Sequence, residues 1–572
     1  MKKVFGYLKS YRLKMGVGLF IKIIGTLMDL TIPWILSYII DEIVPLGDVN
    51  RIILTGILMI ICSFIGLFGN VIANQMAAKI AKLVTTDLRH DLFNKIETLS
   101  SRQIDEVTVP SLISRMSSDT YNVHHMIGMM QRIGVRAPIL LIGGIIVTLT
   151  LDPILTLVLL AVLPLVVIAT YVISKKGIPL FSKVQLAIDD FVRVIRENIA
   201  GIRVIKALSK EDYEKERYHK ISKKLIDYEL SSQKTMIKLN PLINLFLNVG
   251  MVGVIVVGAI RVNSGELLAG KVLAFTTYFT IILNAMLSIT RIFMIFSRAA
   301  ASASRISYIL NLPVEIVKED GGDLKEKGSF IVFNDVSFSY EKKENNIENL
   351  SFELERGESL GIIGATGSGK TTIINLLMRF YDIDSGEILV EGKNIKEYEP
   401  KELRKKFGVV FQNDTIFSTD ILDNINFSRG ISDEEILKAT TTAQALDFIN
   451  NTENGFDTEL SERGTNLSGG QRQRLLISRA LANNPEILIL DDASSALDYK
   501  TESLLRKNLE EKYSETTTII ITQRISSIMN CDKVLVIDEG KVIGYGTHDE
   551  LLKTVKVYQE IYKLQMGGGV NE

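Results

Sequence analysis

Long apolar segments dominate the first 310 residues. Residues 52–78 carry no charged side chain, and a helix of that length extends about 40 Å, more than the ~30 Å hydrocarbon core of a bilayer. Residues 153–174, 239–260 and 272–290 are also uncharged and long enough to cross. Residues 15–40 and 126–151 are apolar apart from Lys22 and Asp29 in the first and Arg132 and Arg136 in the second. The pattern predicts a polytopic α-helical membrane domain with six transmembrane helices.

The connections between these segments differ in charge. The two longest, residues 79–125 and 175–238, are rich in Lys and Arg, whereas the short loops near Asp48, Asp152 and Glu266 are poorer in them. The positive-inside rule then predicts a multi-pass protein of the cell membrane with the long loops and both termini in the cytoplasm. Apolar residues at helical spacing, such as Leu88 and Leu92, continue into the first long loop, so long helices are expected to project inward.

After residue 310 the pattern changes to alternating strands and helices, which is typical of an α/β protein. Residues 330–340 and 359–363 are expected to be strands, and the second is followed by Gly364-Ala-Thr-Gly-Ser-Gly-Lys-Thr-Thr and an apolar helix. This is the phosphate-binding motif GxxxxGK[ST] in its required strand-loop-helix context. Lys370 is expected to neutralise phosphate charge and Thr371 to bind Mg²⁺. The residues expected to hold the nucleotide here are Gly364, Thr366, Gly367, Ser368, Gly369, Lys370, Thr371 and Thr372.

A second apolar strand, residues 487–490, ends in Asp491 and Asp492. A phosphate-transfer enzyme needs a metal-binding carboxylate and a group that orients the attacking water at such a place. Asp491 suits Mg²⁺, and Asp492 is expected to face the γ-phosphate.

Between the two nucleotide motifs, the run Leu467-Ser-Gly-Gly-Gln opens a further helix. Its residues Ser468, Gly469, Gly470 and Gln471 form a second phosphate site at a helix N-terminus. One nucleotide cannot bind at the same time to the N-termini of the helices that follow Gly369 and Ser468 in one monomer. The second site therefore implies a second protomer.

Composition narrows the function classes. Hydrophobic residues make up 47% and charged residues 23% of the chain, which excludes intrinsic disorder. The formal net charge of −1 leaves no global basic field, so no nucleic-acid partner is expected. Two cysteines are too few for a disulfide framework or a structural zinc site.

Together these motifs resemble those of ATP-binding cassette (ABC) exporter half-transporters, and the resemblance covers essentially the whole chain. It implies six transmembrane helices fused to an α/β P-loop NTPase domain, with ATP and Mg²⁺ as cofactors. It also implies that Tyr340 stacks on adenine and that Gln412 is the Q-loop residue, close to the reaction and the metal. Residues 495–498 resemble the D-loop, residues 461–464 the X-loop, and residues 110–115 and 201–207 the two cytoplasmic coupling segments.

The expected domain boundaries follow from the pattern. Residues 1–310 are assigned to the transmembrane domain, 311–328 to a linker, 329–565 to the nucleotide-binding domain and 566–572 to a tail.

Two positions depart from the family's active pattern. The strand that ends in Asp491 resembles the family's Walker B motif, and the next residue, usually Glu, is Asp492; the position after Ile521-Thr522, usually the family's switch His, is Gln523. Asp is one methylene shorter than Glu, and Gln carries neither a proton for transfer nor a positive charge. The pair predicts a site that binds ATP and hydrolyses it poorly. The intact run Leu467–Gln471, which resembles the family's LSGGQ signature, is expected to complete the active site of a different partner chain. The predicted assembly is therefore a heterodimer.

The substrate class is less constrained by the sequence. Ionisable residues within spans are candidates for substrate contact, here Lys22, Asp29, Arg132 and Arg136. Each also has a structural reading, as a snorkelling side chain, a helix-to-helix ion pair or a lipid contact. We expect an amphipathic drug or lipid moved out of the cytoplasm or inner leaflet of the lipid bilayer. The alternatives are a homodimeric exporter of a peptide or lipid and a regulatory ABC ATPase that does not pump.

Overall fold

The computed structural model describes residues 2–319 and 328–566. The chain divides into two compact units: Met1–Glu97 with Pro110–Asn311, and Thr98–Val109 with Leu312–Glu572. Residues 320–327 of the expected linker and residues 567–572 of the expected tail lie outside the described residues. Met566, the first residue of that tail, still belongs to a helix.

The first unit is helical, and six of its helical segments within the described residues are long and apolar enough to cross a membrane. The predicted polytopic helical fold is thereby confirmed. Several helices run far beyond the bilayer thickness: those at 49–97, 153–200 and 269–311 contain 49, 48 and 43 residues. In chain order the helices are α1 (Lys2–Gly6), α2 (Arg12–Tyr38), α3 (Val49–Glu97), α5 (Val109–Ser114), α6 (Thr120–Leu151), α7 (Pro153–Ala200), α8 (Ile202–Ala207), α9 (Glu211–Met236), α10 (Leu239–Asn263) and α11 (Ala269–Asn311).

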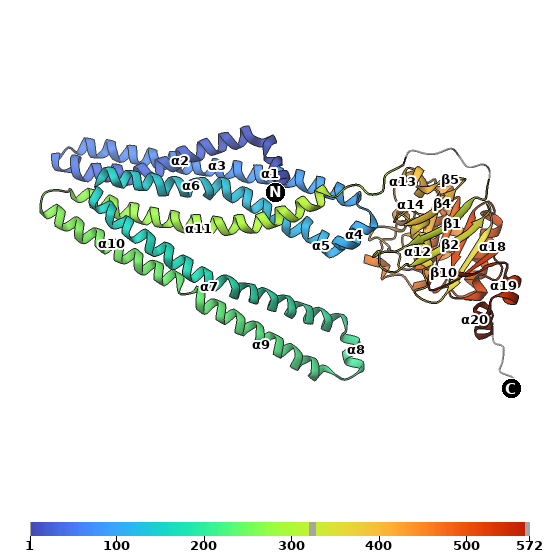
Figure 1. The fold of residues 1–572 in the computed structure, drawn as a ribbon. Coiled ribbons are helices and arrows are strands. Elements are labelled where there is room, and N and C mark those ends of the chain that lie inside the picture. Colours follow the sequence, from blue (N-terminus) through green and yellow to red (C-terminus); the bar gives the residue numbers. More distant parts are fainter. Residues whose placement is uncertain (1, 320–327, 567–572) are drawn as a thin grey trace. The chain divides into compact units, whose positions relative to one another are not determined.

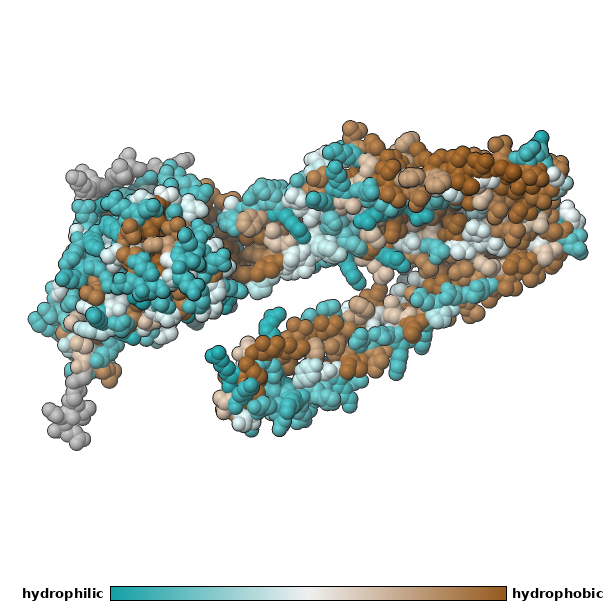
Figure 2. Space-filling view, turned by 180° about the vertical axis from the view of Figure 1, so that it is seen from behind, coloured by the Kyte–Doolittle hydropathy of each residue, from teal (hydrophilic) through white to brown (hydrophobic). Residues whose placement is uncertain are grey.

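Two groups of helices make up this unit. Helices α2, α3, α6 and α11 pack along one another, whereas the distal parts of α7 and α9 form a separate pair that diverges from them (Figure 1). Aromatic side chains of α11, including Phe275, Tyr278 and Phe279, fill the core that joins α11 to its neighbours. Hydrophobic side chains cover much of the unit's outer surface (Figure 2), as expected for helices whose solvent is lipid.

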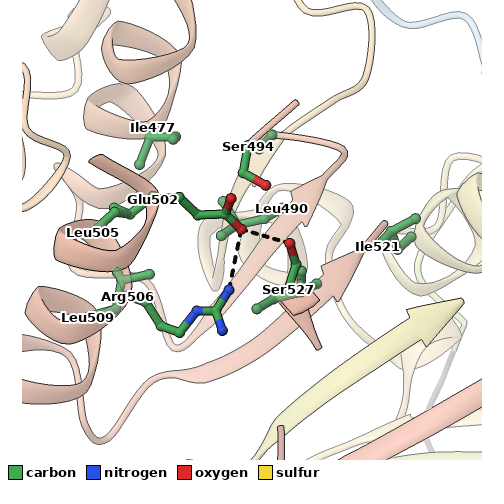
Figure 3. Close-up of a pocket in the computed structure, with 11 residues that line it drawn as sticks. Ile477, Leu490, Ser494, Glu502, Leu505, Arg506, Leu509, Ile521 and Ser527 are labelled. Atoms are coloured by element: carbon green, nitrogen blue, oxygen red, sulfur yellow. Dashed lines mark hydrogen bonds and ion pairs between the residues drawn. The ribbon is translucent and has the colours of Figure 1, made fainter. Parts of the chain in front are cut away.

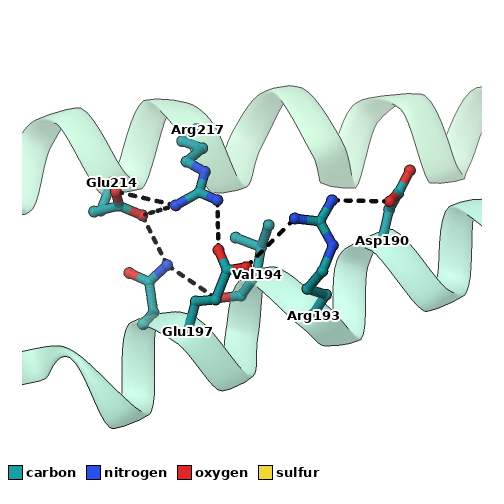
Figure 4. Close-up of polar contacts among 7 residues, drawn as sticks. Asp190, Arg193, Val194, Glu197, Glu214 and Arg217 are labelled. Atoms are coloured by element: carbon teal, nitrogen blue, oxygen red, sulfur yellow. Dashed lines mark hydrogen bonds and ion pairs between the residues drawn. The ribbon is translucent and has the colours of Figure 1, made fainter. Parts of the chain in front are cut away.

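The tip of the α7–α9 pair is held by polar side chains. Arg217 of α9 contacts Glu197 of α7 at 2.5 Å and Glu214 at 3.3 Å, and Arg193 bridges Asp190 and Glu197 (Figure 4). These charges are exposed or half-buried, so each pair contributes little to stability by itself. The tip includes α8, which coincides with the second expected coupling segment.

Two sheets form the framework of the second unit. One is antiparallel with the order β2-β1-β4-β5, and the other has the order β10-β9-β3-β8-β7-β6 with parallel pairing except between β9 and β10. The strands are β1 (Ile331–Phe338), β2 (Ile347–Leu354), β3 (Ser359–Gly364), β4 (Ser385–Val390), β5 (Lys393–Asn394), β6 (Phe407–Val410), β7 (Ile487–Asp491), β8 (Thr517–Ile521), β9 (Lys533–Asp538) and β10 (Lys541–Gly546). The predicted α/β domain is confirmed.

Helices accompany these sheets, and short 3-10 turns lie at Glu462–Gly464 and Ile525–Ser527. The helices are α4 (Ser101–Val107), α12 (Lys370–Leu377), α13 (Pro400–Lys405), α14 (Ile421–Asn426), α15 (Asp433–Thr442), α16 (Leu446–Asn450), α17 (Gly469–Leu481), α18 (Tyr499–Lys512), α19 (His548–Thr554) and α20 (Lys556–Met566). Since β3, β6, β7 and β8 are parallel neighbours, the segments that follow them emerge at one edge of the sheet.

Helix α4 belongs to the second unit, because residues 98–109 group with residues 312–572. The coupling role expected for residues 110–115 stays a prediction. The side chain of Gln103 donates to the carbonyl of Pro313 at 3.0 Å, and Tyr381 donates to Asp105 at 2.5 Å. Polar partners that are distant in sequence fix this position, and no local pattern signals them.

Candidate functional site

A cavity of about 490 Å³ opens at the edge where the parallel strands end. The loop after β3, the end of β7 and the segments after β6 and β8 all contribute to its wall. The lining residues include Thr366, Gly367, Gly369, Lys370, Thr371, Thr372, Gln412, Asp491, Asp492 and Gln523. Residues from four separate parts of the chain thus meet at the place where the motifs predicted a nucleotide site.

The loop between β3 and α12 has a backbone that glycine makes possible. Gly367 and Gly369 have φ angles of 84° and 102°, in the region that residues with a Cβ rarely adopt. A Cβ at Gly369 would also lie 2.7 Å from Ile347 Cδ1 and 2.9 Å from the carbonyl oxygen of Asn346. The loop therefore wraps tightly and directs the N-terminus of α12, with its free amides, toward the cavity.

Hydrogen bonds hold the charged side chains of the cavity in place. The Lys370 ammonium donates to the carbonyls of Gly364 at 2.9 Å and Ala365 at 2.7 Å, and the Thr371 hydroxyl donates to Asp491 at 2.9 Å. Burial raises the pKa of Asp491 above its usual range, and burial also lowers the pKa of Lys370. Both shifts show that the charged forms lack solvation here, so ligands of opposite charge are favoured.

The residues present fit a nucleotide triphosphate with Mg²⁺. Ser368 Oγ is buried without a hydrogen-bond partner among the described residues, at the centre of the loop that wraps the phosphate site. Hydroxyl and carboxylate oxygens, the ligands Mg²⁺ prefers, stand together in Thr371 and Asp491. When bound, Mg-ATP supplies a polarised γ-phosphate. Lys370 would neutralise its charge, and Thr371, Asp491 and the neighbouring Gln412 would hold the metal.

The two atypical residues lie in the same cavity. Asp492 is half-buried, with a backbone φ of 53°, and its N–H donates to the carbonyl of Ile521 at 2.9 Å. Gln523 Nε2 donates to Thr366 Oγ1 at 3.2 Å, which brings the switch position onto the phosphate loop. The parallel pairing of β7 with β8 places both residues beside the expected γ-phosphate.

Tyr340 is beside this cavity but not among its lining residues. Its hydroxyl lies 3.4 Å from Thr372 Oγ1 and accepts a hydrogen bond from Asn375 at 3.2 Å. Its ring packs edge-on against Tyr381 with centroids 5.0 Å apart. The predicted stacking on adenine remains a prediction.

The signature residues are not brought into the cavity of their own chain. Ser468 caps α17: its hydroxyl accepts from the Gln471 N–H at 3.2 Å, and the Gln471 side chain accepts from the Ser468 N–H at 2.8 Å. This capping box leaves the start of α17 well formed. That a second protomer supplies its ligand stays a prediction.

Two positioning residues were missed from the sequence. Gln565 of α20 accepts from the Ile525 N–H at 2.8 Å and donates to the Gln523 carbonyl at 2.6 Å, so the C-terminal helix holds the switch segment. Gln473 of α17 donates to Ser495 at 2.9 Å and accepts from the Ala496 N–H at 2.8 Å, which ties the signature helix to the D-loop. Neither residue belongs to a motif with a spacing that sequence reasoning could use.

A separate, mostly apolar cavity of about 40 Å³ lies behind β7 and β8. Glu502 accepts from Ser527 at 2.7 Å and from Arg506 at 3.3 Å across its mouth, as Figure 3 shows. The cavity is water-sized, and we assign it no nucleotide role. Its polar rim instead fastens the turn that follows Gln523 to α18.

Comparison with known proteins agrees with this geometry. Residues 15–286 match the family model for the ABC transporter transmembrane region, and residues 347–495 match the family model described as ABC transporter. The ABC transporter ATP-binding protein YfiB of Bacillus subtilis is 33% identical, covering 99% of both chains. A putative multidrug export ATP-binding/permease protein of Staphylococcus aureus is 31% identical, covering 99% of this chain and 100% of that protein.

Among solved structures, a bacterial Atm1-family ABC exporter with ATP bound is similar to the whole chain. The TM-score is 0.82 with 25% sequence identity, and the match covers 97% of this chain and 99% of the exporter. A membrane unit of six spans, a phosphate loop beside a Walker B aspartate and full-length relatives together lead to one conclusion: the chain belongs to the ABC transporter family, as an exporter half-transporter.

Proposed function

We propose that this chain is the degenerate-site subunit of a heterodimeric ABC exporter that moves amphipathic drugs or lipids out of the cytoplasm or inner leaflet. The observation that carries the proposal is the joint position of Asp492 and Gln523 in one cavity, while the signature at Ser468 retains its capping geometry. The weak catalysis then concerns only the nucleotide site built on this chain's own phosphate loop. The signature run at Ser468, which a partner's site would use, keeps the family's sequence.

The chemical argument concerns distance and proton capacity. The Asp492 carboxylate stands back by more than about 1 Å from where a Glu carboxylate would reach, and such misplacement is costly for orienting water. Gln523 donates a hydrogen bond from a neutral amide, so it stabilises bound phosphate without carrying positive charge. Lys370 and Thr371 keep the groups needed for binding. Binding without efficient hydrolysis is the expected result.

The membrane unit supports an assembly of two chains. The distal α7–α9 pair diverges from the other helices (Figure 1), and its tip presents exposed apolar residues, among them Val204 and Leu208 at 61% and 64% exposure. Side chains of this kind at a rigid tip suit burial against a second subunit. We assign both termini and the ATP-binding unit to the cytoplasm, because the Lys- and Arg-rich connections lie on that side.

ATP hydrolysis by the purified chain tests the proposal. The full-length chain alone should turn over ATP slowly while binding it, and the complex with its partner should be active. In that complex, Asp492→Glu combined with Gln523→His should raise hydrolysis by at least about tenfold, since general-base catalysis contributes 10²–10⁴-fold. Vigorous turnover by the chain alone would refute the degenerate site, and a homodimeric exporter would replace it.

Transport assays separate pumping from regulation. The complex in proteoliposomes should accumulate an amphipathic dye in an ATP-dependent manner. ATP turnover without vectorial movement of any amphipathic probe would favour the regulatory alternative over the exporter.

A further inference from the structure

Four charged residues of the membrane unit form one cluster, which we call the inner cluster: Lys22 and Asp29 of α2, and Arg132 and Arg136 of α6. Arg136 pairs with Asp29 at 2.9 Å, and Lys22 donates to Asn74 of α3 at 3.0 Å. Lys22 also interacts electrostatically with the other three charges. Residues that are far apart in sequence are thus gathered at the junction of α2, α3 and α6.

The cluster lies toward the N-terminal ends of the membrane-spanning segments of α2 and α6. The helical chain between Lys22 and Leu46, the end of its span, is about 36 Å long. Between Arg136 and Leu151, the end of α6, it is about 22 Å long. With a hydrocarbon core of ~30 Å, Arg136 falls in the half of the core nearer the N-terminus, and Lys22 falls at the edge of that half. If the N-terminus is cytoplasmic, as in the proposed function, that half faces the inner leaflet.

The structure argues against the snorkelling explanation for Lys22. Its exposed fraction is 3%, so neighbouring helices enclose the side chain and keep its ammonium from reaching the lipid headgroups. The polar contact that the structure gives this ammonium is the neutral amide oxygen of Asn74. A buried cation with a neutral partner is costly unless a nearby anion offsets it.

The charges of the inner cluster do not balance. It contains three cations and one carboxylate, and the ion pair found within it among the described residues is that of Arg136 with Asp29. Arg132 Nε donates to the Gly128 carbonyl of its own helix at 3.3 Å. The inner cluster therefore holds an excess of two positive charges in a region of low dielectric constant.

Part of the cluster is accessible. The side chains of Arg136 and Asp29 are 44% and 25% exposed, whereas Lys22 is enclosed behind them. A guanidinium with an open face pairs well with phosphate, phosphonate, sulfonate or carboxylate oxygens. Lys22 would attract such an anion through its charge rather than by contact.

We propose that the inner cluster is a binding site for the anionic headgroup of an amphiphile, which Arg132 and Arg136 contact and Lys22 attracts. Asp29 acts as a placeholder: it pairs with Arg136 when no ligand is bound and competes with the ligand for that arginine. The inference rests on the proposed export function for its biological meaning, but the binding itself does not depend on ATP hydrolysis.

The placeholder role gives opposite signs for two substitutions. Arg132→Gln removes a cation and should weaken binding of an anion by about tenfold, the usual effect of losing one charge-assisted contact. Asp29→Asn removes the competitor and should tighten binding several-fold. If the cluster served only to join α2 to α6, loss of either charge would weaken or leave unchanged the binding of every probe.

The test uses the full-length chain in phosphatidylcholine nanodiscs and the fluorescence of Trp34, the one tryptophan in the chain, which follows Asp29 by five positions in α2. The probes are dodecyl phosphate, dodecyl trimethylammonium and neutral dodecyl maltoside. Dodecyl phosphate should bind most tightly, and its affinity should fall for Arg132→Gln and rise for Asp29→Asn. The matched control is Lys82→Gln, which removes an exposed cation of α3 outside the cluster.

A second arm distinguishes the sources of the anion. Nanodiscs with phosphatidylglycerol should compete with dodecyl phosphate if a lipid headgroup occupies the site, and absence of competition assigns the site to a soluble amphiphile. Equal affinity for the three probes, or weaker phosphate binding by Asp29→Asn, would overturn the proposal. Those results would leave the ATPase test of the proposed function untouched, because neither measurement uses ATP.

Discussion

The C-terminal helix α20 is predicted to control the order of the switch segment through one side chain. Gln565 makes two hydrogen bonds to the backbone around Gln523, one of 2.8 Å from the Ile525 N–H and one of 2.6 Å to the Gln523 carbonyl. Gln523 in turn reaches Thr366 of the phosphate loop. Substitution Gln565→Ala removes both backbone contacts while leaving the helix anchored by the buried Tyr558.

The magnitude follows from the surroundings of these bonds. Gln565 is exposed, so each bond is assigned ~0.5–1 kcal/mol, at the low end of measured values. Their joint loss of ~1–2 kcal/mol changes the population of the open switch segment by a factor of about 5–30. Amide hydrogen exchange measured by mass spectrometry on residues 523–528 should therefore accelerate by that factor.

Lys563→Ala is the matched control, since Lys563 lies on the same helix and is exposed. Unchanged exchange in residues 523–528 of Gln565→Ala would refute the reasoning. Equal acceleration in the Lys563 variant would refute it too, since the cause would then be loss of α20 docking. A weaker ATP affinity in Gln565→Ala, with global unfolding unchanged, would extend the effect from local order to the nucleotide site.

Three further outcomes are expected in the nucleotide-binding unit. Burial raises the pKa of Asp491, so the nucleotide-free fold loses stability as the pH rises from the pKa of the unfolded state through that of the folded state. Asp491→Asn should therefore raise the thermal unfolding midpoint at neutral pH and abolish stabilisation by Mg-ATP. A lowered midpoint would contradict this. Gly369→Ala adds a Cβ at φ 102° that contacts Ile347, so it should lower stability more than Gly367→Ala, where the added Cβ meets no neighbour and only the backbone strain of ~1–2 kcal/mol remains. Thermal unfolding compares the two variants, and equal losses of stability would contradict the steric explanation. Tyr381→Phe removes the 2.5 Å hydrogen bond to Asp105 but keeps the aromatic ring packed on Tyr340. Amide hydrogen exchange in α4 should therefore accelerate several-fold while the affinity for ATP stays unchanged. Unaltered exchange would show that other contacts hold α4.

The membrane architecture was predictable because lipid imposes a simple rule. Residues 52–78 lack charge and are too long for a buried globular helix, and they lie within α3 as expected. Leu88 and Leu92 at helical spacing predicted its extension, and both are fully buried. The grouping of α4 with the second unit was not predictable, because Gln103 and Asp105 position it through partners more than 200 residues away.

The nucleotide motifs were also predictable, since a phosphate loop is local chemistry. Glycine, lysine and threonine in fixed order shape a short backbone segment before a helix, and Gly369 and Thr371 show that shape. The roles assigned to Tyr340, Gln412 and the signature residues stay predictions. Ser468 is not among the residues that line its own chain's cavity, and the second protomer stays a prediction too.

Hydropathy, helical spacing and motif chemistry are properties of residues close together in the sequence, and they were enough to predict six spans and a phosphate site. Polar pairs between residues distant in sequence produce no such pattern. Asp29 with Arg136 and Gln565 with Ile525 join residues separated by 107 and 40 positions, and each pair exists because packing brings two helices or a helix and a turn into hydrogen-bond range. Hydrogen bonds depend on distances of tenths of an ångström, which folding of the whole unit sets and no periodicity in the sequence records.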